Sequence, residues 1–103
     1  MTKSDISKQF ALLRKYGYKV INLNEKRSFR AGQRDFVDLC IFNAHYLVFV
    51  EVKIGKDILS EGQKDTAIKL SSIMAINKTV YYFQIKTLAE AKIIQEKILS
   101  KTL

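Results

Sequence analysis

The sequence predicts an α/β domain in which a mixed β-sheet is flanked by helices. Four short segments are rich in β-branched and aromatic residues, and three longer ones repeat apolar residues at helical spacing. The second half of the chain runs strand, helix, strand, an order that favours a parallel crossover. The expected element order is α-β-β-β-α-β-α. A chain of 103 residues fits a single domain spanning residues 1–103.

The first helix is expected from Asp5 to Tyr16. Its apolar residues recur at helical spacing: Ile6, Phe10, Leu13, Tyr16. Ser4 is the expected N-cap, and Gly17 is expected to end the helix in a left-handed conformation. A short strand should follow over Tyr18 to Leu23. The polar and basic segment from Asn24 to Arg34 is then expected to be a loop.

The remaining elements are read from alternating apolar segments and cap signals. Phe36–Phe42 and Tyr46–Val52 predict two strands, and Thr79–Ile85 predicts a third. Helices are expected over Ser60–Ile76 and Thr87–Ser100. The last helix begins with a Thr-x-x-Glu capping box.

A tight hairpin is predicted because only residues 43–45 separate the ends of two of these strands. If Ala44 and His45 are the two central residues of the turn, Phe42 lies opposite Leu47. A shift by one residue would move every side chain to the other face of the sheet. The pairing farther along the hairpin therefore depends on this turn.

Two carboxylates interrupt the apolar hairpin strands. With the register above, Asp38 lies opposite Glu51 on one face, with Cβ atoms roughly 4.5–5.5 Å apart, where like charges repel. Lys53 follows two residues after Glu51 and shares that face. A buried carboxylate is costly unless it is paired, protonated or bound to a cation. Because Mg²⁺ and Mn²⁺ prefer oxygen ligands, a divalent cation between the two acids would reverse their repulsion.

The charge balance favours a polyanionic partner. Eighteen Lys and Arg residues against ten Asp and Glu give a net charge of +8 and a pI near 9.7. Nucleic acid fits better than an anionic membrane, because the charge is spread along the chain rather than gathered on one basic amphipathic helix. No apolar run reaches the ~20 residues of a membrane span, and no signal-peptide pattern is visible. We expect an intracellular, cytoplasmic protein, and the single Cys40 suits a reducing compartment.

Basic residues on two segments are candidates for contacting phosphates. Those in the loop before the hairpin and those after it are Lys26, Arg27, Arg30, Arg34, Lys56, Lys64. The other interpretation of such a cluster is a solvated, charged loop. The overall excess of positive charge favours phosphate contact.

Asp38, followed after a hydrophobic strand by Glu51-Val52-Lys53, resembles the signature of the PD-(D/E)XK nuclease superfamily. The segment Lys15-Tyr16-Gly17-Tyr18-Lys19-Val20 and the segment Ser60-Glu61-Gly62-Gln63 are most similar to two of its branches. These are the virus-type replication-repair nuclease domain and the archaeal Holliday-junction resolvases. The similarity covers roughly Ile6 to Ile85. It implies a restriction-endonuclease-like fold and metal-dependent hydrolysis of DNA in repair, recombination or phage replication.

The resemblance also implies roles for individual residues. Asp38, Glu51 and the backbone carbonyl of Val52 would bind one or two Mg²⁺ or Mn²⁺ ions. Lys53 would orient the attacking water or offset charge in the transition state. Gln63 matches a glutamine found near the site in these branches. Products with 5′-phosphate ends and a homodimeric assembly are expected by the same analogy.

Two departures from the family pattern stand out. Val37 occupies the position of the proline in the motif, and the first helix has no Glu to assist the metal. Only Asp5 is near the matching place, and its first-turn position is equally suited to the helix dipole.

Other interpretations of the site residues remain open. Asp38 and Glu51 could each pair with a lysine or face water, and Gln63 could act as part of a Ser-x-x-Gln capping box. Asp35 is a second candidate acid, whereas His45 is expected to be a turn residue. The alternative function is a non-catalytic, basic nucleic-acid-binding module.

Overall fold

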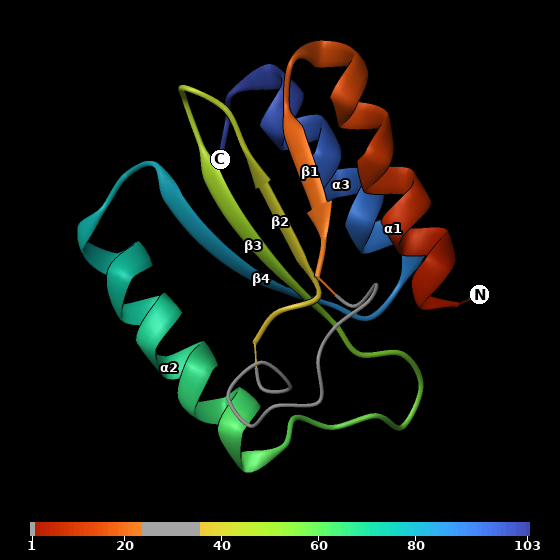
Figure 1. The fold of residues 1–103 in the computed structure, drawn as a ribbon, viewed down its shortest axis with the longest axis vertical. Helices are drawn as coiled ribbons and strands as arrows, with labels where there is room; N and C mark the ends of the chain where they lie inside the picture. Colours follow the sequence, from red (N-terminus) through yellow and green to blue (C-terminus); the bar gives the residue numbers. More distant parts are fainter. Residues whose placement is uncertain (1, 24–35) are drawn as a thin grey trace.

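A four-stranded mixed β-sheet in the order β1-β2-β3-β4 forms the centre of the protein (Figure 1). The computed structural model describes residues 2–23 and 36–103. Its elements are α1 (Lys3–Ala11), a 3₁₀-helix η1 (Leu12–Tyr16), β1 (Lys19–Asn22), β2 (Leu39–Phe42), β3 (Leu47–Val52), α2 (Glu61–Ile76), β4 (Val80–Ile85) and α3 (Leu88–Ser100). The pairs β1–β2 and β2–β3 are antiparallel, and β3–β4 is parallel. The predicted α/β class and order of elements are confirmed.

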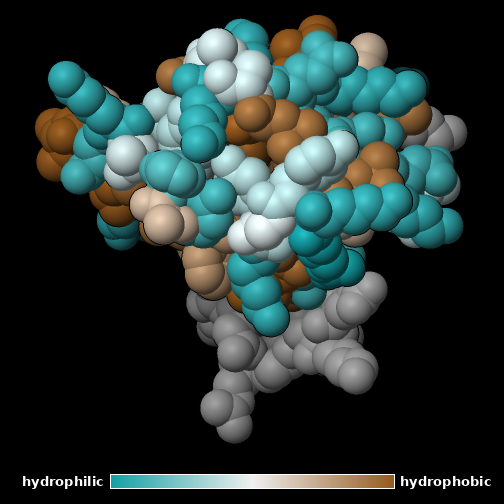
Figure 2. All heavy atoms as spheres, turned by 90° about the horizontal axis from the view of Figure 1, so that it is seen from above, coloured by the Kyte–Doolittle hydropathy of each residue, from teal (hydrophilic) through white to brown (hydrophobic). Residues whose placement is uncertain are grey.

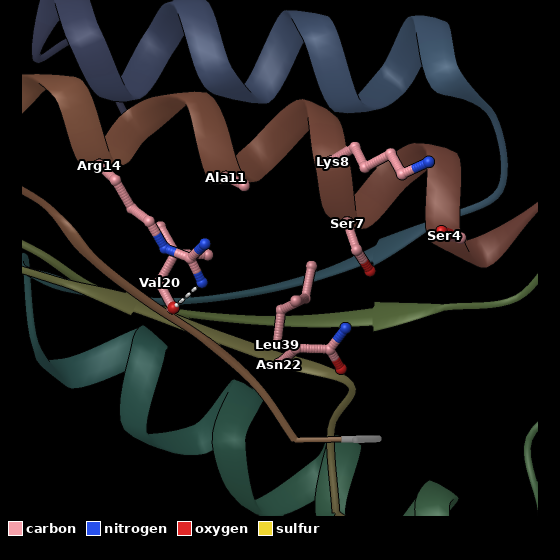
Figure 3. Close-up of a pocket in the computed structure, with 8 residues that line it drawn as sticks. All are labelled: Ser4, Ser7, Lys8, Ala11, Arg14, Val20, Asn22 and Leu39. Carbon is pink, nitrogen blue, oxygen red and sulfur yellow. Dashed lines mark hydrogen bonds between the residues drawn. The ribbon is translucent and has the colours of Figure 1, made fainter.

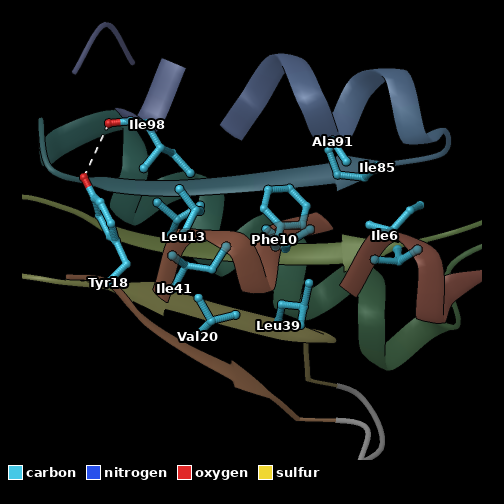
Figure 4. Packing of buried hydrophobic residues seen from close by; sticks show 13 residues of the cluster. Ile6, Phe10, Leu13, Tyr18, Val20, Leu39, Ile41, Ile85, Ala91 and Ile98 are labelled. Atoms are coloured by element: carbon cyan, nitrogen blue, oxygen red, sulfur yellow. Dashed lines mark hydrogen bonds between the residues drawn. The ribbon is translucent and has the colours of Figure 1, made fainter. Parts of the chain in front are cut away.

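The helices cover the two faces of the sheet unequally (Figure 1). Helices α1 and α3 pack together on one face, where aliphatic side chains surround Phe10 (Figure 4). Helix α2 lies on the other face over a smaller buried cluster: Val37, Ala67, Leu70, Tyr82. Hydrophilic side chains project over much of the face drawn in Figure 2, with apolar patches between them. No helix in the described ranges is long and apolar enough to cross a membrane.

The first helix begins earlier than the sequence pattern predicts. Thr2 is the N-cap, since its hydroxyl accepts from the Asp5 N–H and its own N–H donates to the Asp5 carboxylate at 2.8 Å. The prediction of Ser4 as the cap was wrong, because this reciprocal capping box forms two residues earlier. The helix tightens into η1 and ends at Gly17, whose φ of 86° is left-handed as predicted.

The hairpin between β2 and β3 has the predicted register. Phe42 pairs with Leu47, and the backbone N–H of Asn43 donates to the Tyr46 carbonyl at 3.1 Å. The Asn43 side-chain oxygen also accepts from the His45 N–H at 2.7 Å. This local bond fixes the turn, and with it the pairing of the two strands as far as Leu39 and Val50.

The last two helices have the caps that the sequence indicates. Ser60 precedes α2 and accepts from the N–H three residues on. Thr87 precedes α3 and accepts from the Glu90 N–H at 3.1 Å. The Glu90 carboxylate accepts from the Lys86 N–H rather than completing the box at Thr87 N–H. Both helix starts therefore agree with the sequence prediction.

Candidate active site

Asp38 lies at an irregular position between two strands. Its N–H donates to the Val50 carbonyl at 3.0 Å, and its own carbonyl accepts from the Leu23 N–H at 2.8 Å. A regular strand residue directs both groups to the same neighbour, so Asp38 departs from strand geometry. This is why β2 begins at Leu39, whereas the sequence pattern placed its start at Phe36.

The carboxylates of Asp38 and Glu51 are brought together as predicted. The regular pairing ends at Leu39 and Val50, and the Asp38 N–H bonds to the Val50 carbonyl, but the Asp38 carboxylate still lies close enough to interact with that of Glu51. Both residues are buried, with 4% and 2% of their surfaces exposed. The Asp38 Oδ2 atom accepts from the Val52 N–H at 2.7 Å, which holds this carboxylate against the end of β3.

Glu51 has polar partners from two directions. Its Oε1 atom lies 3.7 Å from Lys53 Nζ and accepts from Gln63 Nε2 at 3.2 Å. Burial raises the pKa of Glu51 from 4.5 to about 7, and the neighbouring Asp38 carboxylate adds to the rise. The ammonium groups of Lys53 and Lys3 oppose it. The acid pair is thus a place where negative charge is costly.

Gln63 has both of the roles that its sequence position suggested. Its Oε1 atom accepts from the Ser60 N–H at 3.0 Å, and its N–H donates to the Ser60 hydroxyl, which completes the capping box of α2. Its Nε2 atom donates to Glu51. One side chain therefore ties the start of α2 to the buried carboxylate.

Lys3 is a neighbour of the site that the sequence reasoning missed. It is half-buried in the first turn of α1, and its charge lowers the pKa of Glu51. Residues 3 and 51 are on different elements, and no motif or spacing connects them. Only the packing of α1 against the sheet brings this cation near the acid pair.

The donor set suits a hard divalent cation. Because the Val52 N–H points toward Asp38, the Val52 carbonyl lies along the same edge of β3. Two carboxylates and a carbonyl are oxygen ligands, and Mg²⁺ often takes one or two carboxylates with water and substrate phosphate as its remaining ligands. Within residues 2–23 and 36–103, no group of three or more His, Cys, Asp or Glu residues is placed to hold a metal. The two carboxylates and the carbonyl could therefore hold such a cation only together with water or another oxygen ligand.

Several other predicted residues are exposed to solvent or serve local structure. The exposed Lys64 is paired with Glu61 at 3.2 Å on the first turn of α2, and Lys56 is exposed after β3. His45 lies in the hairpin turn, and Asp5 caps α1. Basic residues of the predicted loop lie outside the described residues, as does the alternative acid: Lys26, Arg27, Arg30, Arg34, Asp35.

Known proteins offer no relative from which the role of this site could be taken. No family model, curated protein or solved structure gives a significant match to this chain. The structure itself defines a buried pair of carboxylates with a lysine and a glutamine on one of them. Such a constellation, at the ends of two neighbouring strands, is typical of a catalytic or metal-binding site.

Proposed function

We propose that this protein is a Mg²⁺- or Mn²⁺-dependent nuclease that hydrolyses phosphodiester bonds in DNA, with a restriction-endonuclease-like fold of the PD-(D/E)XK type. The observation that carries the proposal is the buried contact between the carboxylates of Asp38 and Glu51, with Lys53 on Glu51. Two buried acids side by side destabilise the fold unless a proton or a cation offsets their charge. A divalent cation offsets both at once.

Each residue then has a defined task. Asp38, Glu51 and the Val52 carbonyl would hold the cation, which when bound supplies Lewis acidity and a coordinated water of lowered pKa. Lys53 is 13% exposed, so its ammonium can meet the scissile phosphate or hold the attacking water. Gln63 fixes the rotamer of Glu51 through its amide. The net charge of +8 supports a polyanionic substrate.

Branched DNA is the substrate class that we propose, in repair, recombination or phage replication. A single site built on Asp38 and Glu51 would cut one strand at a time. Cutting two strands of a junction symmetrically requires two copies, so we propose a homodimer as the active form. The same arrangement would place two positively charged subunits on one branched molecule.

A cleavage assay tests the proposal directly. Labelled duplex, single-stranded, flap and four-way-junction DNA would be incubated with Mg²⁺, Mn²⁺ or EDTA. We expect metal-dependent cutting that is lost in Glu51→Ala and Lys53→Ala. Glu61→Ala removes an exposed acid and should cut normally. Cutting that persists in Glu51→Ala would contradict the assigned site.

Metal binding can be tested without catalysis. Mg²⁺ or Mn²⁺ should raise the melting temperature of the wild-type protein, because a ligand that binds only the folded state stabilises it. Asp38→Ala should abolish the shift. A folded protein that binds nucleic acid in a salt-sensitive way, without a metal shift or cleavage, would instead be a basic nucleic-acid-binding module.

A further inference from the structure

A groove of about 260 Å³ lies between α1 and the edge strand β1 (Figure 3). The polar groups along it come from both elements: Ser4, Ser7, Lys8, Arg14, Asn22. The two hydroxyl side chains on α1 are short, so they leave space between the helix and the strand. The groove lies apart from the buried acid pair and is not needed to explain it.

The outer edge of β1 forms one wall of this groove. Because the Leu23 N–H bonds to β2, the backbone groups of Val20, three residues earlier, point away from the sheet. Arg14 confirms this direction, since its Nη2 atom donates to the Val20 carbonyl at 2.6 Å (Figure 3). This bond anchors the guanidinium in the groove. A guanidinium has five N–H donors, so this contact leaves others for an anion.

The groove carries positive charge at two points. Lys8 and Arg14 are exposed, and neither forms an ion pair with any acid in the parts of the chain that the structure describes. Asp5, three residues before Lys8 on the helix, has its carboxylate bonded to the N–H and hydroxyl of Thr2. These bonds are the main cause that lowers the pKa of Asp5, and the charge of Lys8 contributes as well. Six residues of helix separate Lys8 from Arg14, or about 10 Å along the axis. That separation suits two different phosphates of one strand.

One end of the groove lies next to Asp38 in the sheet. Asn22 lies at this end and pairs with Leu39. The residues next to this pair, Leu23 and Asp38, are joined by a hydrogen bond from the Leu23 N–H to the Asp38 carbonyl. The charge of Lys3, in the first turn of α1, acts on Glu51. Glu51 itself meets Gln63 on the α2 face, so a strand lying in the groove would pass the end of β1 to reach the two carboxylates.

We infer that this groove binds the phosphodiester backbone of the nucleic-acid strand whose neighbouring phosphate reaches Asp38 and Glu51. The location of the cut rests on the proposed function, whereas binding in the groove requires neither metal nor catalysis. Lys8 and Arg14 neutralise two phosphates of the strand, and the Ser7 hydroxyl donates to a phosphate oxygen. The contacts are with the backbone, so they carry no base specificity.

Binding of a labelled oligonucleotide, followed by fluorescence anisotropy in EDTA across a salt series, tests the inference. Lys8→Ala should weaken binding roughly fivefold and reduce the slope of log K against log salt by about one. Ser7→Glu places a negative charge in the groove and should weaken binding further. Lys78→Ala is the matched control, because this exposed lysine precedes β4 at the opposite edge of the sheet.

The outcomes separate this inference from the proposed function. Arg14 bonds to the backbone, so its substitution risks the fold, and the test therefore relies on Lys8→Ala and Ser7→Glu with unchanged melting temperatures. If Lys8→Ala and Ser7→Glu bind as tightly as Lys78→Ala while the wild-type protein cleaves DNA, the proposed binding in the groove is wrong and the proposed nuclease activity is retained. If Lys8→Ala and Ser7→Glu bind more weakly but the wild-type protein shows no cleavage, binding in the groove is supported and the proposed nuclease activity is wrong. Absence of nucleic-acid binding by the wild-type protein overturns the groove.

Discussion

The two faces of the sheet differ in what they bury. The face under α1 and α3 encloses aliphatic side chains packed around Phe10, all shielded from water. The face under α2 has a smaller apolar cluster and also contains Glu51, which meets Gln63 at the start of that helix. The core under α1 and α3 stabilises the fold, whereas the buried carboxylate of Glu51 on the α2 face destabilises it when it is ionised. A sheet can bear a costly acid pair on one side when the other side is well packed.

Removing the acid on the α2 face should have the largest effect on activity. We expect Glu51→Gln to lower the cleavage rate on the order of a thousandfold, because a neutral amide is a poor ligand for a divalent cation. Single-turnover cleavage of junction DNA with Mg²⁺ would measure it. Glu61→Gln, an exposed acid on α2, is the matched control and should retain full activity.

Because the two buried clusters differ in size and burial, the same Leu→Ala substitution should lower the free energy of unfolding by different amounts in each. Leu13 is fully buried in the α1 and α3 cluster, whereas Leu70 is 8% exposed beneath α2. We expect Leu13→Ala to lower the free energy of unfolding by about 3–4 kcal/mol and Leu70→Ala by about 2 kcal/mol. Urea unfolding of both variants measures the difference. Equal losses would mean that the two faces contribute alike to stability.

The hairpin is the part of the site that sequence reasoning could predict. Turn residues 43–45 fix which side chains face each other, and a period of two carries that register along both strands. Local rules predicted that Asp38 and Glu51 lie near each other, although the regular pairing ends at Leu39 and Val50. The cap of α2 was equally visible, because Ser60 and Gln63 have the spacing of a capping box.

Tertiary packing decided the features that sequence reasoning missed. Asp38 leaves the regular strand because its carbonyl and N–H bond to different neighbouring strands. The charge of Lys3 acts on Glu51 only through the packing of α1 on the sheet, since the two residues lie on separate elements. Neither relation has a short-range signature. The groove between α1 and β1 likewise depends on how a helix lies over an edge strand.

The raised pKa of Glu51 predicts how stability depends on pH without metal. The folded-state pKa of about 7 exceeds the ordinary value of 4.5. The stabilising contribution of the protonated form is therefore complete below pH 4.5 and is lost as the pH rises through 7. At about 1.4 kcal/mol per pKa unit, the loss is about 3 kcal/mol. The difference in unfolding free energy between wild type and Glu51→Gln, measured by urea unfolding between pH 4 and 8, isolates it.

A bound cation should reverse this dependence. The cation binds the deprotonated carboxylate and competes with the proton, so stabilisation by Mg²⁺ should be larger at pH 8 than at pH 6. Melting temperatures at fixed Mg²⁺ concentration would measure it. The same stabilisation at both pH values would show that Glu51 is not a ligand.

Substitution of Gln63 should have the smallest effect. Its side chain supports both the cap of α2 and the orientation of Glu51, but each of these also has other partners. Gln63→Ala removes the bond to Ser60 and the bond to Glu51, and we expect a loss of about 1 kcal/mol in the free energy of unfolding. Cleavage should fall roughly tenfold, since Glu51 loses the amide that orients it. Urea unfolding and single-turnover cleavage measure the two effects separately.

Gln63→Glu separates the cap from the contact with Glu51. A glutamate can still accept from the Ser60 N–H, so the start of α2 is preserved. Its carboxylate faces Glu51, however, and like charges repel. Without metal at pH 8 we expect a lower melting temperature than in Gln63→Ala, and with Mg²⁺ a larger upward shift than in wild type, because a third carboxylate joins the two acids. Identical behaviour of the two Gln63 variants would mean that the side chain acts only as a helix cap.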